Sequence, residues 1–247
     1  MELLRVGDHT ITAEEIIPVL AGYQMLPSLL REIILDRAVA DIECSSEEAQ
    51  QARAAFYGQN KISNEEELSA YLQQLGMTAE QLDHLAVRGI KIEKYKLATW
   101  GGKLESYFLQ RKQQLDRVIY SLIRTKDAAV AQELYFRIQE GEQSFSDLAK
   151  EYSQGSEAET GGLIGPVEIS TPHPILAQLF LRSQPGELAP PTRAGDWIVI
   201  VRLEKFIPAQ LDDAMRRRLL NELFTRWLQE EVQKNIADLR PVEASRI

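Results

Sequence analysis

The stretch that decides the fold reads Phe145-Ser-Asp-Leu-Ala-Lys-Glu-Tyr-Ser153 and, eight residues on, Gly161-Gly-Leu-Ile-Gly165. Phe145, Leu148 and Ala149 stand at helical spacing, which predicts a short helix with one apolar face. The polar, glycine-containing residues that follow predict a loop. The glycine motif then leads into a short strand and not into a helix, which argues against a phosphate-binding glycine loop.

Outward from this stretch, strands and helices alternate. Residues 118–123 are rich in β-branched and aromatic side chains, which favours a strand. On the other side, Pro172 and Pro174 fix the start of a helix, and residues 197–201 form the most hydrophobic strand pattern of the chain. The pattern predicts helices at 127–140, 144–152 and 174–182, and strands at 118–123, at 163–167, from Leu188 and at 197–201. We therefore expect an α+β domain in this region.

The flanking segments read as helical, apart from an extended lead-in at 3–11. A Ser or Thr followed three residues later by Glu or Gln, the capping-box pattern, predicts helix starts. It occurs at Thr12–Glu15, Ser45–Glu48, Ser63–Glu66 and Thr78–Gln81. Strong helix patterns cover 28–42 and 90–114, the second weakened at Gly101-Gly102, and a last helix is predicted over 208–239. This last helix is too apolar on one face to stand alone, so we expect it to pack on the N-terminal helices.

Composition limits the possible partners. The chain has 247 residues, is 44% hydrophobic and carries a net charge of −9. A binder of nucleic acid needs a basic surface, so this balance argues against one. No apolar run approaches the roughly 20 residues that span a bilayer, so we expect no membrane insertion.

The reactive residue types give no metal or disulfide pattern. Cys44 is the only cysteine, and a lone cysteine forms no internal disulfide. The histidines His9, His84 and His173 lack ligand spacing, so we expect no metal and no cofactor. Residues 1–10 have no basic segment followed by an apolar one, as a secretory signal would. We therefore expect a cytoplasmic protein.

Four motifs in order and at matching spacing resemble those of parvulin-type peptidyl-prolyl cis/trans isomerases. They cover about 90 residues of the chain, between residues 117 and 206. In family notation they are "FxxLAxxYS" at 145–153, "GGDLG" at 161–165, "KPGE(I/V)S" at 184–188 and "GxHIIxL" at 195–203. The resemblance implies a four-stranded antiparallel sheet with about four helices.

The first half of the chain resembles SurA- and PrsA-like chaperones. Val6–Thr12 is similar to their "VNGxxIT" opening, and similar elements cover Leu29–Asp36 and Glu105–Lys112. In that family the N-terminal helices and a C-terminal helix form one chaperone module. The resemblance implies three segments: a helical N-terminal domain at 1–115, a parvulin-like domain at 116–206 and a C-terminal helix at 207–247.

The resemblance also places the parvulin site on this sequence, residue by residue. The two family histidines fall on Tyr120 and Trp197, and the Asp or Cys falls on Gln154. Thr192 keeps the family's Ser or Thr, while Leu163 replaces the Asp of "GGDLG". The apolar pocket for proline is expected at Ile164, Leu176 and Leu181. Most of the polar network is thus replaced, although Tyr120 and Trp197 can each donate one hydrogen bond. The same two aromatics can equally be read as core residues of a sheet.

Three functions remain open on these residues. We expect a foldase or chaperone that binds extended or proline-containing polypeptide clients, with weak or absent isomerase activity. An active isomerase is the second reading; its activity would be flat from pH 5 to 8, because no site histidine ionises. The third is an interaction scaffold for one partner of a peptide-export or maturation system.

Overall fold

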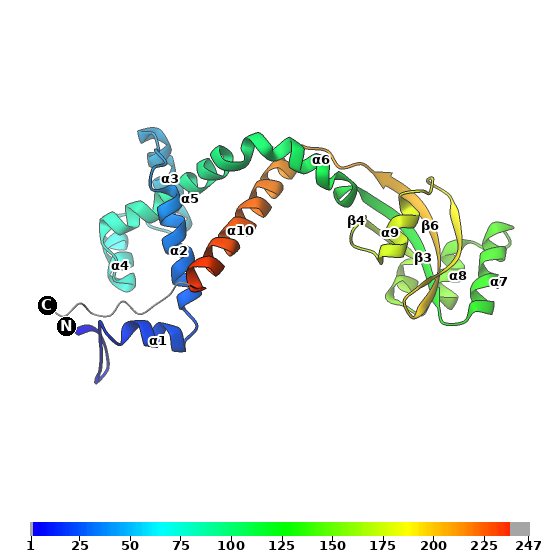
Figure 1. Ribbon diagram of the computed structural model, residues 1–247, viewed down its shortest axis with the longest axis horizontal. Helices are drawn as coiled ribbons and strands as arrows, with labels where there is room; N and C mark the ends of the chain where they lie inside the picture. The colour runs from blue at the N-terminus through cyan, green and yellow to red at the C-terminus, as the bar shows by residue number, and fades with distance from the viewer. Residues whose placement is uncertain (1, 238–247) are drawn as a thin grey trace. The chain divides into compact units, whose positions relative to one another are not determined.

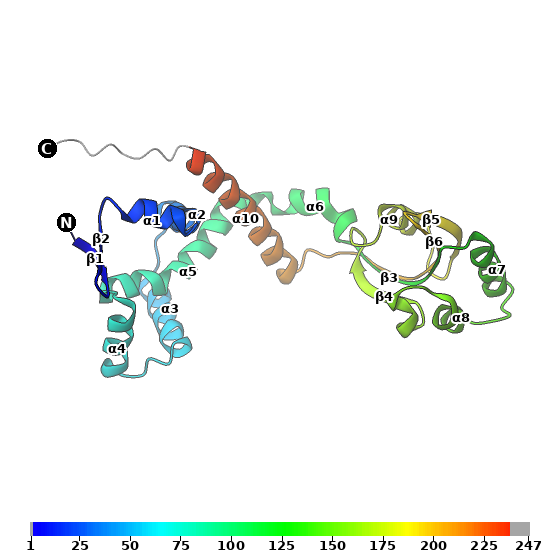
Figure 2. The same cartoon turned by 90° about the horizontal axis from the view of Figure 1, so that it is seen from below.

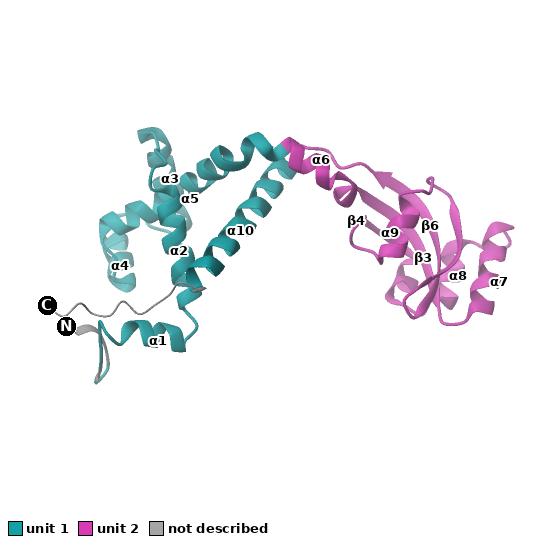
Figure 3. Ribbon diagram, in the orientation of Figure 1, with its two compact units in different colours: residues 1–104, 213–247 teal, residues 105–212 magenta. Residues whose placement is uncertain are grey.

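The computed structural model describes residues 2–237, which form two compact units (Figure 3). One unit comprises Glu105–Asp212, and the other combines Met1–Leu104 with Asp213–Ile247. The predicted boundaries at 115/116 and 206/207 remain a prediction, and the two compact units divide at 104/105 and 212/213.

The unit at 105–212 is built on an antiparallel sheet of four strands in the order β4-β3-β6-β5 (Figure 1). The central pair, β3 and β6, runs in register from Arg117↔Ile207 to Thr125↔Ile198, with one irregularity next to Tyr120. The strands are β3 (Arg117–Thr125), β4 (Leu163–Glu168), β5 (Leu188–Ala194) and β6 (Trp197–Ile207). The helices are α6 (Leu104–Leu115), α7 (Ala128–Gln139), α8 (Phe145–Tyr152), the 3-10 helix η2 (Ser156–Thr160) and α9 (Pro174–Phe180).

Each face of this sheet has its own core. Side chains alternate between the two faces of a strand, so neighbouring residues of β3 serve different cores. Ile123 packs with Leu134 of α7 and Leu148 of α8. Tyr120 and Leu122 pack instead with α9. Figure 2 shows α8 and α9 on opposite sides of the sheet.

The glycine motif brings β4 and its loop close to β3. Gly162 has φ +87°, and a Cβ there would lie 2.8 Å from the Leu122 carbonyl oxygen. Gly165 has φ +116°, and its Cβ would lie 2.6 Å from the Val118 carbonyl oxygen. Both the positive φ and the close backbone approach exclude larger residues. This close approach is the physical reason why the glycine motif is needed for β4 to pair with β3.

The other unit is mainly helical. It contains the hairpin β1 (Glu2–Val6) and β2 (His9–Thr12), then α1 (Ile16–Gly22), α2 (Leu26–Val39), α3 (Ser46–Gln59), α4 (Glu65–Leu75), α5 (Ala79–Trp100), the 3-10 helix η1 (Gly101–Lys103) and α10 (Asp213–Ala237). Helix α10 contacts α2 and α5. Leu35 of α2 is buried against Phe224 and Leu228 of α10. Trp100 and Trp227 pack on the same cluster, with ring centroids 5.9 Å apart.

The predicted α+β class is confirmed, including the helical unit that contains the C-terminal helix. Two of the four predicted capping boxes, at Ser45 and Thr78, are present. The one at Ser63 is wrong by one residue, because Asn64 caps α4 by accepting from the Glu67 N–H. At Thr12 the carboxylate of Glu15 does reach back, but α1 begins only at Ile16.

The last helix was predicted to start too early. Strand β6 continues to Ile207, so α10 starts at Asp213 and not at residue 208. Residues 208–212 form neither strand nor helix, and within them the Ala209 N–H donates to Asp116 Oδ1 at 2.7 Å instead of starting a helix. The predicted last residues of this helix, 238–239, lie outside the described residues.

Candidate functional site

An apolar floor lies where the α9 face of the sheet meets the helix. Leu176 and Phe180, four residues apart on α9, share one side of that helix and are 4% and 1% exposed. The ring of Phe180 lies 4.7 Å from the ring of Tyr120, centroid to centroid. Ile164 and Trp197 are partly buried against the same cluster. Strands β3, β4 and β6 and helix α9 thus each contribute to this floor, which is a hydrophobic cluster in which Tyr120, Leu176 and Phe180 are buried.

The structure brings four of the predicted site residues together and leaves three apart. Tyr120, Ile164, Leu176 and Trp197 belong to the floor just described. Thr192 lies on β5, where its hydroxyl donates to the Pro190 carbonyl at 2.9 Å. Leu181 is 47% exposed after the end of α9. The side chain of Gln154 is exposed, and its backbone N–H donates to the Arg124 carbonyl at 2.9 Å.

Gly155, the residue after Gln154, lies directly against the side chain of Arg124. A Cβ placed on Gly155 would lie 2.0 to 2.3 Å from three atoms of the Arg124 guanidinium group. The Arg124 side chain therefore occupies the volume that a side chain at position 155 would need. Arg124 stands two residues after Leu122 on β3, at the spacing that puts both on one face of a strand.

Arg124 is held by a buried carboxylate. Its Nε donates to Glu157 Oε1 at 2.8 Å, and its Nη2 makes a second, parallel contact with Oε2. The Ser153 hydroxyl donates to the same carboxylate at 2.6 Å and accepts the Arg124 backbone N–H at 3.0 Å. Such a pair, with two parallel hydrogen bonds, holds the guanidinium group in one orientation and also compensates its charge. The 3-10 helix η2 supplies Glu157, which is 4% exposed.

The pKa values follow from this packing. Burial by itself raises the pKa of Glu157, but the hydrogen bonds from Arg124 and Ser153 outweigh it, so the net pKa is lowered. Burial, followed by the charge of Glu157, raises the pKa of Tyr120, so its hydroxyl keeps its proton at neutral pH. The site therefore contains a carboxylate, a guanidinium and a neutral phenol.

Two cations flank the indole of Trp197. Arg124 Cζ lies 5.7 Å and Lys126 Nζ 5.2 Å from the ring centroid. Both distances are within the range of cation–π attraction. At the position that the resemblance assigns to a histidine, the chain thus has an indole ring that contacts two cationic side chains.

Groups that transfer protons near neutral pH are scarce here. His173 is the one histidine in residues 105–212, and its Nδ1 accepts the Ile175 N–H at 3.3 Å at the start of α9. Among residues 2–237, no group of three His, Cys, Asp or Glu side chains is placed to hold a metal ion. In the same part of the chain, no helix is long and apolar enough to cross a membrane.

The sequence reading missed Arg124, Gly155, Glu157 and Phe180. A charged residue at an inward position of a strand requires a buried partner, because an unpaired buried charge is costly. That signal was present in the order Leu122, Ile123, Arg124. Nothing in the sequence singled out Glu157 among the other carboxylates nearby, because the choice depends on where the loop folds.

Comparison with known proteins gives a family match for one segment of the chain. Residues 122–205 match the rotamase family, described as the PPIC-type PPIASE domain. Foldase protein PrsA of Clostridium botulinum (strain Loch Maree / Type A3) is 25% identical over 186 residues, which cover 74% of this chain and 53% of that protein. The chain thus spans about half the length of this curated relative.

A likeness of fold extends along nearly the whole chain. The crystal structure of the peptidylprolyl isomerase PrsA from Bacillus cereus aligns with 99% of this chain and 95% of its own. The TM-score is 0.54 at 17% sequence identity. This likeness agrees with the fold of the chain, which joins an α+β unit and a helical unit.

Proposed function

We propose that this chain, a protein with a parvulin-type rotamase domain, is a foldase-type chaperone that binds extended or proline-containing polypeptide. In this proposal isomerase activity is weak or absent. The observation that carries the proposal is the asymmetry of the site. Ile164, Leu176 and Phe180 pack together in its apolar floor, while Tyr120 and Trp197 stand at the positions that the resemblance assigns to the two histidines. The similar foldase PrsA and the matched rotamase domain support client binding.

The chemistry of the residues explains why binding is favoured over catalysis. Rotation about an X–Pro bond faces a barrier of about 20 kcal/mol, because the amide is conjugated. A floor that accepts the proline ring gives affinity for the planar amide and for the twisted one alike, which does not lower the barrier. In this site Arg124 is paired with Glu157, and the phenol of Tyr120 and the indole N–H of Trp197 are neutral donors.

A protease-coupled assay on short X–Pro peptides tests the isomerase part. We expect a catalytic efficiency close to that of buffer and, for any residual activity, no change between pH 5 and 8. A bell-shaped profile with a midpoint near pH 6.5 would point to a histidine in catalysis and would contradict the proposal.

Aggregation of several unrelated unfolded proteins tests the chaperone part. We expect slower aggregation at a near-equimolar amount of this protein. Failure with every client, together with tight capture of one dedicated partner, would favour the scaffold for a peptide-export or maturation system.

We also propose a cytoplasmic location, which cell fractionation with an antibody to the chain checks.

A further inference from the structure

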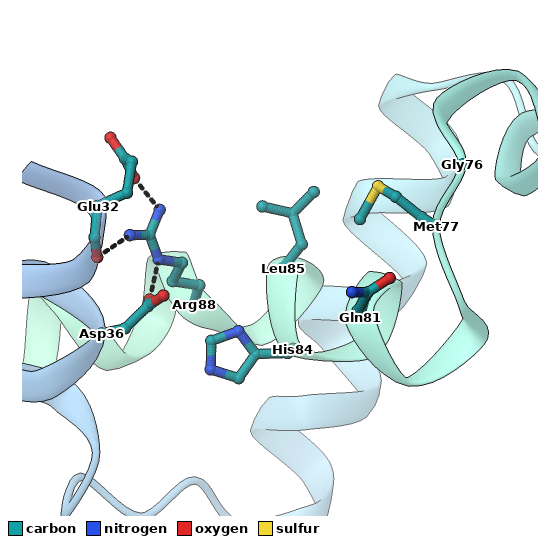
Figure 4. A pocket seen from close by; sticks show the side chains of 8 residues that line it. All are labelled: Glu32, Asp36, Gly76, Met77, Gln81, His84, Leu85 and Arg88. Atoms are coloured by element: carbon teal, nitrogen blue, oxygen red, sulfur yellow. Dashed lines mark hydrogen bonds and ion pairs between the residues drawn. The ribbon is translucent and has the colours of Figure 1, made fainter. Parts of the chain in front are cut away.

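A groove lies within the helical unit, and all of its lining residues belong to that unit. It has a volume of about 470 Å³ and opens between α2, the turn after α4 and the first half of α5. This volume is within the range of ligand and peptide pockets. Figure 4 shows residues from all three segments around it. The lining residues are Glu32, Asp36, Gly76, Met77, Gln81, His84, Leu85 and Arg88.

One part of the groove is apolar. Leu85 of α5 is 39% exposed, although it faces the groove together with Met77. Leu75, directly before the lining glycine, is 50% exposed. On α2, Leu29 and Ile33 are each 40% exposed and precede Asp36 at steps of four and three residues, on the same side of the helix. Leu29, Ile33 and Leu75 do not line the groove, but they are exposed apolar side chains close in sequence to residues that do.

The other part of the groove is acidic. Arg88 donates to Asp36 Oδ1 at 2.7 Å and also bonds the carboxylate of Glu32 (Figure 4). One guanidinium thus faces two carboxylates, whose side chains remain 50% (Glu32) and 47% (Asp36) exposed. A carboxylate has about four acceptor positions, so both can accept further donors from solvent or from a ligand.

The surrounding helices add to this negative charge. Residues 41–83, which form α3, α4 and the start of α5, contain nine Asp and Glu residues against two Lys and Arg residues. Helix α3 packs on α5, and α4 leads directly into the lining turn. An excess of negative charge near a groove favours partners of the opposite sign and speeds their association.

We propose that this groove binds a cationic amphipathic segment of the client, with leucine-like side chains between lysines or arginines. The inference rests on the proposed chaperone function and adds the chemical class of client that the helical unit selects. The apolar side chains of the segment pack on Leu85, Met77 and the exposed face of α2. Its cations pair with Glu32 and Asp36, and the acidic helices α3 and α4 attract it at longer range.

Fluorescence anisotropy with the full-length chain tests this proposal. The probe is a short labelled peptide of lysine and leucine at helical spacing, compared with versions in which every lysine becomes glutamine or glutamate. We expect the lysine peptide to bind about tenfold more tightly than the glutamine version at low salt. The difference should shrink as salt is raised. Equal affinities for the three peptides would overturn the proposal.

Two matched variants locate the site. Leu85→Gln removes an apolar contact from the groove, and Leu109→Gln changes a leucine that is 69% exposed on α6, outside the groove. We expect about tenfold weaker binding of the lysine peptide for the first and a change within about twofold for the second. The same loss in both variants, or in neither, would refute the assignment to this groove.

Two further results separate this inference from the general function. Suppressed client aggregation with no preference for the lysine peptide would overturn the groove assignment and leave the proposed function intact. Sedimentation of the chain tests self-association. A dimer that dissociates in the Leu85→Gln variant would show that a second copy covers the groove, which also contradicts the proposal.

Discussion

At the scale of single residues, Arg124 and Glu157 determine what the rotamase site contains. The pair fills the volume beside Gly155 and brings a positive charge against the indole of Trp197. A buried ion pair contributes little net stability by itself, but the loss of one partner leaves the other without compensation. The stability of the domain should therefore depend on each member of this pair.

Glu157→Gln should destabilise the unit at 105–212 by about 1–3 kcal/mol at pH 7, because the guanidinium loses its counter-charge. The pKa of Glu157 is lower in the folded protein than its ordinary value. A lowered folded-state pKa gives stability that is complete above the unfolded pKa and is lost as the pH falls through the folded one. Denaturant unfolding at pH 7 and below pH 4 checks this: the gap between wild type and variant should narrow on acidification. A constant gap would contradict it.

Gly155→Ala should also be destabilising, by about 1–3 kcal/mol, because the new Cβ overlaps the held guanidinium group. In an Arg124→Ala background the same change should cost much less, since the obstructing group is gone. A double-mutant cycle by urea unfolding measures this coupling. Gly58→Ala in α3, where a new Cβ meets no neighbouring atom within 4 Å, is the control and should be neutral or stabilising. Additive effects at 124 and 155 would rule out the overlap.

At the scale of elements, the starts of the helices show which sequence signals act without tertiary contacts. The hydroxyl groups of Ser45 and Thr78 accept the N–H of Glu48 and Gln81, each at 3.2 Å. Both boxes are completed by a side chain that reaches back to the cap N–H. These local bonds need no tertiary contact, which is why the sequence pattern finds them.

Ser45→Ala should destabilise the helical unit by about 1 kcal/mol, because α3 loses its cap. Ser63→Ala is the matched control. Its sequence pattern is the same, but the cap of α4 is Asn64. The control should therefore change stability by less than about 0.5 kcal/mol. Thermal unfolding followed by circular dichroism compares the two, and equal losses would show that the cap assignment is wrong.

At the scale of the whole molecule, the chain leaves the helical unit, forms the unit at 105–212 and then returns to the helical unit through α10. The returning helix supplies Phe224 and Leu228 to a core with Leu35 of α2. Phe224 lies 6.1 Å from the ring of Trp100. The helical unit is thus completed by residues more than 100 positions later in the chain.

Phe224→Ala should destabilise the helical unit by about 3–5 kcal/mol, through lost burial and the cavity left behind. Hydrogen exchange followed by mass spectrometry on the full chain resolves the effect by segment. We expect faster exchange in α2, α5 and α10 and unchanged protection in β3 and β6. Phe136→Ala, at a phenylalanine that is 51% exposed on α7, is the control. Loss of protection in β3 and β6 would show that the units do not unfold independently.

The sequence by itself determined the layout of this protein. Motifs that act through local geometry, such as the caps at 45 and 78, specify their elements wherever the rest of the chain lies. Strand and helix patterns in 117–206, together with the family resemblance, predicted the sheet and the apolar floor. The α+β class followed from them.

Only the tertiary structure decided how the site is filled. Arg124 and Glu157 are 33 residues apart, and their pairing exists because η2 folds against β3. Phe180 adds an aromatic ring to the floor beside the predicted Leu176. The two side chains lie side by side because one helical turn of α9 separates them. The groove beside Leu85 likewise joins α2 to α5 across about 50 residues of chain. Local patterns predict elements, but contacts between distant segments depend on the packing of all of them at once.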